Sequence, residues 1–224
     1  MSRFRVGIDI GGTFTDIVFL NSEGRLFTKK VPSSVDNYAR AIVEGMAEVF
    51  DEASITPKDI RELRHGTTVA SNAILELKGA RVGLITSAGF RDVLEIRTLR
   101  MPRLYDLAWE KPPALVERYL RQVVDERINA NGVIERRPQR SEVEQVVRRL
   151  LDEKVEAIAI CLINAYANPD NERFVEQIVK EMAPDLPLCI SADVLPEMKE
   201  YERTSTTVIN AYVLPVVGTY LTAL

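Results

Sequence analysis

The sequence has few of the residues that build metal centres, disulfide frameworks or membrane spans. Its 224 residues include one histidine, His65, and two cysteines, Cys161 and Cys189, each within an apolar segment. One histidine excludes a multi-histidine metal site, and two cysteines placed in this way indicate reduced core thiols of a cytoplasmic protein. No apolar run reaches the roughly 18–20 residues of a membrane-spanning helix. The acid at Asp9 also comes too early for the apolar stretch of a secretory signal.

An excess of basic residues is missing too. The chain carries 29 lysines and arginines against 33 aspartates and glutamates, a net charge of −4. Non-specific nucleic-acid binding needs a high density of basic groups to displace counterions from phosphates, so the composition argues against that function class. The hydrophobic fraction of 46% is enough for a sizeable core, and the length allows one large domain or two small ones. We therefore expect a mixed α/β protein with no nucleic-acid or membrane partner.

The first third of the chain alternates short β-rich runs with turns. Three runs predict the strands of an antiparallel meander, namely residues 4–10, 17–20 and 25–31. The second run is apolar at every position, which predicts a strand buried on both faces. Two helices and a buried strand are expected to follow, at residues 36–52, 67–78 and 81–86. His65 would then lie after a short strand and just before the second helix.

The middle of the chain is less regular, and a clear alternation follows it. Residues 97–118 contain three prolines and predict a long surface excursion, and residues 121–137 predict a β-hairpin around Asn131-Gly132. A helix is then expected to begin at a capping box formed by Ser141 and Glu144. The elements after it are expected to be a strand, a helix and a strand, at residues 155–163, 172–182 and 186–191. The predicted division is a lobe at 1–138, a small α/β layer at 139–195 and a C-terminal helix at 196–224.

The predicted C-terminal helix ends on an almost continuous apolar segment. Pro215 and Gly218 are positions where it could kink. Its last turns carry an apolar strip made of Leu214, Val216, Val217, Tyr220 and Leu221. Because monomeric proteins rarely expose contiguous apolar patches, we expect this strip to be buried, whether against its own domain, against another copy or a partner of the chain, or by further sequence.

The strongest chemical signal lies in the segment Gly7-Ile8-Asp9-Ile10-Gly11-Gly12-Thr13-Phe14-Thr15-Asp16. An acid ends a strand, two glycines turn the chain, and two hydroxyl residues lead into the next strand. Glycines let backbone N–H groups approach an anion closely, and Thr13 and Thr15 can donate hydroxyl hydrogens to phosphate oxygens. Asp9 can hold Mg²⁺ through its water shell. The alternative is a hairpin turn that uses glycines for geometry and the acids and threonines for local hydrogen bonds.

An Asp-x-Gly between two antiparallel strands resembles the first phosphate loop of the sugar kinase, actin and Hsp70 superfamily. Two further segments narrow the resemblance: HGTTVASNA at 65–73, with ITSAGFRD at 85–92 downstream, and LPEMKEYERTSTTVINAY at 195–212. Together they resemble the hydantoinase A/5-oxoprolinase family, which includes subunits of acetone and acetophenone carboxylases. The resemblance runs along the whole chain but corresponds only to the N-terminal domain of that family and the start of the next domain. The family's second phosphate loop and adenosine-binding glycines have no counterpart in these residues.

The resemblance implies a ribonuclease-H-like (actin-like ATPase) lobe with a mixed sheet, plus the small α/β layer. It implies ATP and Mg²⁺ as cofactors and ATP-dependent hydrolysis of a cyclic amide or imide of the hydantoin or 5-oxoproline type, by phosphorylation of the amide oxygen. Asp9 would orient Mg²⁺, and Asp16 would brace the loop or assist the metal. The residues expected to hold the phosphates are Gly11, Gly12, Thr13 and Thr15.

The candidate substrate-side residues come from the other two segments. His65 could serve as acid, base or hydrogen-bond donor near neutral pH, although it could also simply cap a turn. Thr67, Thr68, Asn72 and Arg203 are the candidate substrate-binding residues. Arg203 lies in a polar row on one helix face that could equally serve packing between lobes.

Two other functions remain open at the level of sequence. The chain could be a subunit of an ATP-dependent carboxylase of the acetone or acetophenone type, in which the same phosphorylation activates a ketone or bicarbonate. It could also be a catalytically inactive fragment or assembly domain. The expected partners are a small cyclic amide and either further copies of the chain or a hydantoinase B-type subunit.

Overall fold

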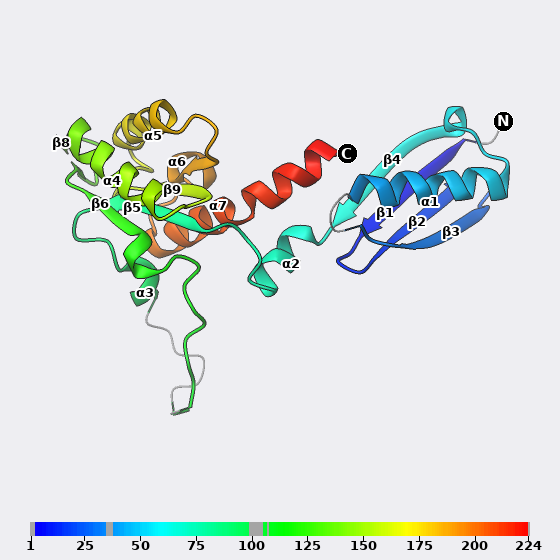
Figure 1. The fold of residues 1–224 in the computed structure, drawn as a ribbon, viewed down its shortest axis with the longest axis horizontal. Helices are drawn as coiled ribbons and strands as arrows, with labels where there is room; N and C mark the ends of the chain where they lie inside the picture. Colours follow the sequence, from blue (N-terminus) through cyan, green and yellow to red (C-terminus); the bar gives the residue numbers. More distant parts are fainter. Residues whose placement is uncertain (1–2, 35–37, 99–104, 107, 224) are drawn as a thin grey trace. The chain divides into compact units, whose positions relative to one another are not determined.

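The structure, a computed structural model, describes residues 3–34, 38–98, 105–106 and 108–223 (Figure 1). The chain divides into two compact units, the first formed by Met1–Gly79 with Val216–Leu224 and the second by Ala80–Pro215. Each unit contains its own sheet and its own buried apolar residues. Within the described part of the chain, no helix combines the length and the apolar character needed to cross a membrane.

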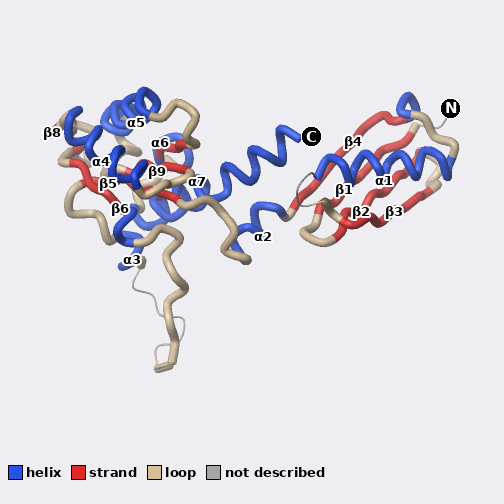
Figure 2. Tube along the Cα trace, in the orientation of Figure 1, coloured by secondary structure: helices blue, strands red, loops and turns tan. Residues whose placement is uncertain are grey.

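The first unit is built on a four-stranded mixed sheet with the order β3-β2-β1-β4 (Figure 2). Its strands are β1 (Phe4–Ile10), β2 (Phe14–Asn21), β3 (Leu26–Pro32) and β4 (Ile60–Thr67). The pairs β1–β2 and β2–β3 are antiparallel, whereas β1–β4 is parallel. The predicted meander is therefore confirmed. The helical elements of this unit are α1 (Tyr38–Ala53), the 3-10 turn η1 (Pro57–Asp59), α2 (Val69–Leu75) and the end of α7 (Glu200–Ala223).

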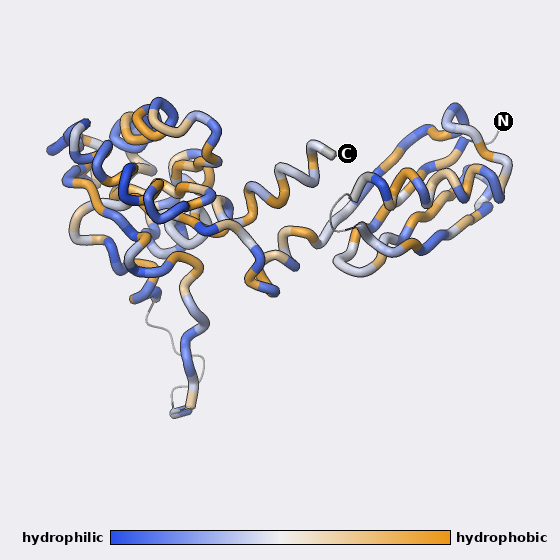
Figure 3. Tube along the Cα trace, in the orientation of Figure 1, coloured by the Kyte–Doolittle hydropathy of each residue, from blue (hydrophilic) through white to orange (hydrophobic). Residues whose placement is uncertain are grey.

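Alternate residues of β1 and β2 face α1 and form the core of this unit, and Figure 3 shows the alternation of hydrophobic and hydrophilic residues along the strands. Phe19 is fully buried, and its ring lies edge-on to Phe4 and to Phe50 of α1, with centroid separations of 6.4 and 5.8 Å. Val18 and Leu20 point to the other face and are 37% and 44% exposed. The prediction that this strand is buried on both faces is therefore wrong.

The last turns of α7 contribute to the same core. Tyr220 is only 2% exposed, and Val216 packs against the cluster of buried residues in the first unit. Of the alternatives predicted for the apolar strip, burial against its own domain is therefore the one observed for Val216 and Tyr220, and neither further sequence nor a partner is needed to cover these two residues. Leu221, by contrast, is 57% exposed. The helix continues through Pro215, as predicted.

The second unit contains a four-stranded sheet in which every pair is parallel, with the order β10-β9-β5-β6. Its strands are β5 (Val82–Ser87), β6 (Arg121–Val124), β9 (Ala157–Cys161) and β10 (Leu188–Ile190). Every residue of β5 and β9 is buried. A Cβ on Gly83 would lie 3.0 Å from the Leu150 side chain, because α4 packs directly on β5. The helices are α3 (Val93–Ile96), η2 (Arg118–Leu120), α4 (Arg140–Asp152), α5 (Asp170–Met182), α6 (Ser191–Val194) and the first part of α7.

The division of the chain differs from the predicted one. Strands β5 and β6 were expected in the lobe of residues 1–138, yet they share a sheet with β9 and β10. The boundary expected between residues 138 and 139 therefore falls inside the second unit. The expected alternation of helix and strand after it is present as α4, β9, α5 and β10.

Two local predictions in this unit need correction. The range 121–137 is not one hairpin, because β6 joins the parallel sheet and only β7 (Arg127–Ile128) and β8 (Ile134–Arg136) pair antiparallel. Ser141 is the second residue of α4 rather than its cap, and Glu144 forms an ion pair with Arg140. Between α3 and η2 the described residues form no helix or strand, as expected for the excursion, and residues 99–104 and 107 lie outside the described part.

Candidate functional site

The glycine loop between β1 and β2 is a tight turn that requires glycine. The N–H of Gly11 donates to the carbonyl of Phe14 at 3.0 Å. A Cβ on Gly11 would lie 2.9 Å from that same carbonyl oxygen, closer than real side chains come to backbone. The turn therefore holds residues 11–13 at the end of a paired hairpin, where Gly12 and Thr13 are exposed to solvent.

Ser33, just after β3, fixes this loop from the side. Its hydroxyl donates to the carbonyl of Gly11 at 2.8 Å, and its N–H donates to the carbonyl of Thr13 at 2.9 Å. The hydroxyl of Thr15 lies 2.9 Å from the Ser33 hydroxyl, and Thr15 is fully buried. Thr15 thus stabilises the loop through its contact with Ser33, whereas Thr13 is exposed to solvent. The sequence analysis missed Ser33, although the meander register that pairs Phe14 with Pro32 places it beside the loop.

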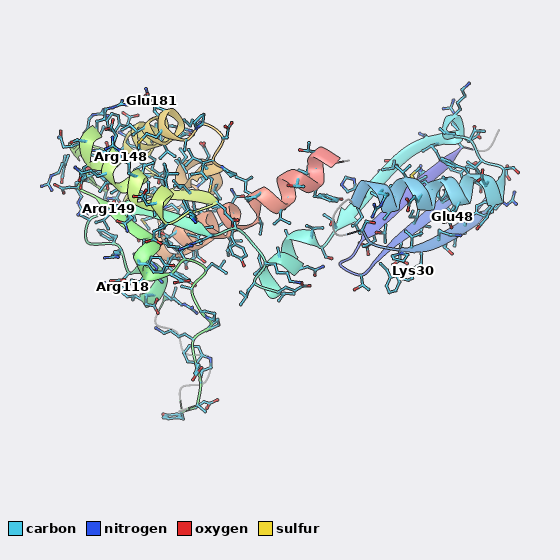
Figure 4. The ribbon with its side chains drawn as sticks, viewed as in Figure 1. Lys30, Glu48, Arg118, Arg148, Arg149 and Glu181 are labelled. Atoms are coloured by element: carbon cyan, nitrogen blue, oxygen red, sulfur yellow. The ribbon has the colours of Figure 1, made fainter. Side chains whose placement is uncertain are left out.

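A row of residues in register crosses the sheet next to the loop. Gly66, Asp9, Asp16 and Lys30 are partners on β4, β1, β2 and β3 in turn. Lys30, labelled in Figure 4, donates to the carboxylate of Asp16 at 2.7 Å. No described side chain forms an ion pair with Asp9. Asp9 and Asp16 therefore stand opposite each other on neighbouring strands, and Gly66 on the other side of Asp9 has no side chain.

Helix α2 approaches the glycine loop from the other side. A Cβ on Gly12 would lie only 2.8 Å from the side-chain nitrogen of Asn72. That nitrogen donates to the hydroxyl of Thr68 at 3.2 Å, and the N–H of Thr68 donates to the carbonyl of Ile10 at 3.2 Å. The structure therefore brings Asn72 and Thr68 together with the loop, and the absence of a side chain at Gly12 is what allows the contact.

His65 lies on the opposite face of the sheet from Asp9. It lies within β4 rather than after a strand, because β4 runs on to Thr67 and the helix begins only at Val69. Its register partner is a core-facing residue of β1, so strand alternation points His65 away from the Asp9 row. Its ring lies edge-on to Tyr220, with the centroids 6.0 Å apart. Burial raises the pKa of Tyr220, and a hydrogen bond with Thr67 partly offsets this.

Arg203 belongs to the second unit and is 1% exposed. One of its terminal nitrogens donates to the carbonyl of Leu162 at 2.8 Å and to the hydroxyl of Ser191 at 3.2 Å. Its position is thus defined within the second unit, by the carboxyl end of β9 and the start of α6. The residues assembled at the loop itself are Asp9, Gly11, Gly12, Thr13, Asp16, Thr68 and Asn72, with Ser33 and Lys30 added by the structure.

These residues fit a metal ion that is held mainly by water and phosphate oxygens. Asp9 offers an exposed carboxylate beside a second one, which suits the hydrated Mg²⁺ ion. Within the described ranges no three histidine, cysteine, aspartate or glutamate side chains are grouped closely enough to hold a metal.

The fold and the loop define an α/β protein whose first unit presents a glycine turn at the end of a mixed sheet. Residues 5–183 match the hydantoinase/oxoprolinase N-terminal region. The chain belongs to this family.

The chain is similar to several known enzymes. It is 35% identical to the caprolactamase subunit alpha of Pseudomonas jessenii, over 98% of the chain and 32% of that subunit. It is 32% identical to 5-oxoprolinase 1 of Arabidopsis thaliana, over 98% of the chain and 19% of that protein. The structure superposes on the ATP-dependent caprolactamase of Pseudomonas jessenii with a TM-score of 0.87 at 35% identity, covering 97% of this chain and 32% of that one. It superposes on nucleotide-free acetone carboxylase with a TM-score of 0.90 at 26% identity, covering 100% of this chain and 34% of that one.

These matches confirm the predicted fold class and the predicted family. The chain spans about a third of the caprolactamase subunit and about a fifth of the plant 5-oxoprolinase.

Proposed function

We propose that this chain is the N-terminal, phosphate-binding part of an ATP-dependent hydrolase that opens cyclic amides. The proposal combines the family with the named activities of its relatives, which are a caprolactamase and 5-oxoprolinases. Both of those names describe a ring that contains an amide bond. The single observation that supports it most in this chain is the glycine loop that Ser33 fixes beside the carboxylate of Asp9, which forms no ion pair with any described residue.

The proposed reaction activates a poor electrophile. The amide oxygen attacks the γ-phosphorus of ATP, so an O–P bond forms, the bond to ADP breaks and the amide becomes an imidate phosphate. Water adds to its carbon, the C–N bond breaks, and the released amine takes a proton. A second water then breaks the C–O bond of the acyl phosphate, which yields a carboxylate and inorganic phosphate. The protein's task is to position the groups and to balance the charge on the transferred phosphoryl group.

The residues of the loop have distinct roles in this proposal. Backbone N–H groups of Gly12 and Thr13 and the exposed Thr13 hydroxyl bind phosphate oxygens, as donors held rigidly by Ser33. Asp9 binds the water shell of Mg²⁺, which when bound neutralises phosphate charge. Lys30 keeps Asp16 in place through their ion pair. Thr68 and Asn72 line the side of the loop where a substrate would approach.

His65 and Thr67 have a different role in this proposal. Both flank Tyr220 on the core side of β4. They position β4, and with it Gly66 and the start of α2, rather than contact the transferred phosphoryl group. Thr15 acts in a similar way from within the loop's hydrogen-bond network.

The experiment that tests the proposal uses the full-length protein with any partner subunit that copurifies. ATP hydrolysis is measured with and without a lactam for the natural protein, for Asp9→Asn and for the control Asp51→Asn, an exposed carboxylate on α1. We expect Asp9→Asn to lower lactam-dependent ATP hydrolysis by at least about 100-fold, within the range of a lost charge-stabilising group, and Asp51→Asn to change nothing. Full activity of Asp9→Asn would refute the assignment of the loop.

A carboxylase subunit is the second candidate, because the whole of this chain superposes on 34% of the acetone carboxylase chain with a TM-score of 0.90. In that case the same loop would activate a ketone or bicarbonate by phosphorylation. The two candidates are separated by the substrate that stimulates ATP hydrolysis. Stimulation by a lactam alone supports the hydrolase, whereas stimulation that requires both a ketone and bicarbonate supports the carboxylase. No stimulation by either would support an assembly domain without turnover.

We also propose a multi-subunit assembly in the cytoplasm. The relatives include proteins named as subunits, among them the caprolactamase subunit alpha, so a hydantoinase B-type partner or further copies of the chain are expected. Both cysteines are free and buried, which suits a reducing compartment. Burial raises the pKa of Cys161 to about 11, so this thiol stays protonated and unreactive there.

A further inference from the structure

The parallel sheet of the second unit has a topological switch point between β5 and β9. The chain passes from β5 to β6 on one side, returns to β9 on the other side, and then continues outwards to β10. In open parallel sheets, ligands bind outside the carboxyl ends of the strands at such a point. Thr86 of β5 and Cys161 of β9 are register partners at these ends.

A small cavity and a larger cleft lie at this position. The cavity has a volume of about 10 Å³, room for one heavy atom, and Thr86, Cys161, Arg203 and Thr204 are among the residues that line it. The cleft has a volume of about 420 Å³. Three residues line both of them, namely Phe90, Val93 and Glu200. The cavity is therefore the inner end of the cleft.

Arg203 is a buried cation at this inner end without an ion-pair partner among the described residues. Its terminal nitrogen is bonded to the Leu162 carbonyl and the Ser191 hydroxyl, but its Nε–H is buried and has no acceptor. A buried donor without an acceptor is unfavourable, and more so on a charged group. The Nε edge of a guanidinium is suited to carboxylate oxygens.

The nearby carboxylate does not satisfy this arginine. Glu172 accepts from the N–H groups of Leu162 and Ala192 and from the hydroxyl of Ser191, at 2.6 to 2.9 Å. Its two oxygens are thus occupied by other donors. Cys161 is a neutral thiol whose sulfur lies 3.1 Å from the Thr204 hydroxyl. Neither group supplies the acceptor that the Nε–H of Arg203 lacks.

The cleft outside the cavity has one apolar side and one acidic corner. Phe90, Val93 and Ile96 provide the apolar wall, and Ile96 is 53% exposed. Glu200 lies where cavity and cleft meet and has no ion-pair partner within the described residues. Arg97, Lys199 and Glu202 complete the charged lining of the cleft, which with Glu200 consists of two positive and two negative side chains.

We infer that the second unit holds a separate binding site for an aliphatic α-amino acid, with one carboxylate oxygen in the cavity at Arg203, the ammonium at Glu200 and the side chain against Phe90, Val93 and Ile96. The arrangement matches the ligand group by group. The inner cation Arg203 takes the carboxylate, Glu200, which lines both the cavity and the cleft, takes the ammonium on the adjacent carbon, and the apolar wall takes the aliphatic chain. The inference does not depend on the proposed cyclic-amide chemistry.

The test uses titration calorimetry on the full-length protein with norleucine as the probe, and hexanoate and hexylamine as its two single-charge analogues. We expect norleucine to bind with a dissociation constant on the order of 1 mM and each analogue to bind at least about tenfold more weakly. Glu200→Gln should weaken norleucine about tenfold and leave hexanoate unchanged. The matched control is Glu197→Gln, an exposed acid in the same stretch, which should change neither.

Arg203→Lys should weaken norleucine and hexanoate together, by at least about tenfold. If Arg203→Lys fails to fold, Glu200→Gln still decides the question, because Glu200 is partly exposed and its loss leaves the buried network intact. Absence of norleucine binding at about ten times the expected dissociation constant overturns the inference. Equal binding of norleucine and hexanoate, or unchanged norleucine binding in Glu200→Gln, overturns it as well. Lactam-dependent ATP hydrolysis, measured alongside, reports separately on the loop of the first unit.

Discussion

Glu172 is predicted to make the second unit less stable as pH rises. Its side chain is fully buried on α5. Burial, the largest effect, raises its pKa from 4.5 to about 7, although hydrogen bonds from Ser191, Leu162 and Ala192 and the charge of Arg203 act in the opposite direction. The folded protein therefore holds a proton on this carboxyl group at pH values where the unfolded chain has released it.

The sign and size of the effect follow from this difference. Between pH 4.5 and about 7 the folded state binds more protons than the unfolded state, so the free energy of unfolding falls as pH rises through this window. The contribution of Glu172 to the free energy of unfolding is complete below pH 4.5 and is lost above about pH 7. At about 1.4 kcal/mol for each pH unit, the loss is at most about 3.5 kcal/mol, a large fraction of the stability of a small domain.

The assay is urea unfolding of the full-length protein, followed by circular dichroism, at about pH 5 and about pH 8. Glu172→Gln should remove most of this pH dependence, because glutamine cannot titrate. Glu197→Gln, which replaces an exposed acid, should keep it. A natural protein that becomes more stable between these two pH values would refute the reasoning. So would an unchanged pH dependence in a folded Glu172→Gln.

Three further substitutions test the first unit. Phe19→Ala removes a fully buried ring that packs on Phe50 and should lower the free energy of unfolding by about 3–5 kcal/mol in urea titrations; a loss below about 1 kcal/mol would mean that the core can collapse around the cavity. Ser33→Ala should raise the KM for ATP several-fold while stability falls by only about 1 kcal/mol, and an unchanged KM would remove Ser33 from the loop's support. Gly11→Ala should abolish ATP hydrolysis because its Cβ would lie 2.9 Å from a carbonyl oxygen, whereas Gly7→Ala, with nothing within 4 Å, should be tolerated. Equal activity of both variants would contradict the argument that the turn has no room for a side chain at Gly11.

Local patterns in the sequence were sufficient for most elements of the first unit. The glycine loop and the meander were predicted from turn residues, and α1 from apolar residues at a spacing of 3.6. Both signals lie within a short stretch of sequence. The exposure of Val18 and Leu20 could not be read in the same way, since an apolar run does not reveal whether its second face is covered. Folded proteins keep many apolar side chains at the surface, so an apolar strand can have its second face either covered or exposed.

Features that depend on pairing between distant residues were not predictable. His65 was a candidate for the substrate side of the site, but only the register of β4 against β1 shows that it points to the face opposite Asp9. The membership of β6 in the parallel sheet is another non-local choice, made by its pairing with β5. Tyr220 reaches the core of the first unit from the end of α7, more than 140 residues along the chain from the strands it packs against. Sequence periodicity carries no information on such partners.

The most direct test of the proposed chemistry follows the oxygen of the amide. The full-length protein is incubated with ATP and a lactam whose carbonyl oxygen is ¹⁸O, and the inorganic phosphate released is analysed by mass spectrometry. If ATP phosphorylates the amide oxygen and water attacks carbon, one ¹⁸O atom appears in the phosphate for each ring opened. Phosphate that carries no label, with all ¹⁸O retained in the carboxylate of the product, would contradict the account.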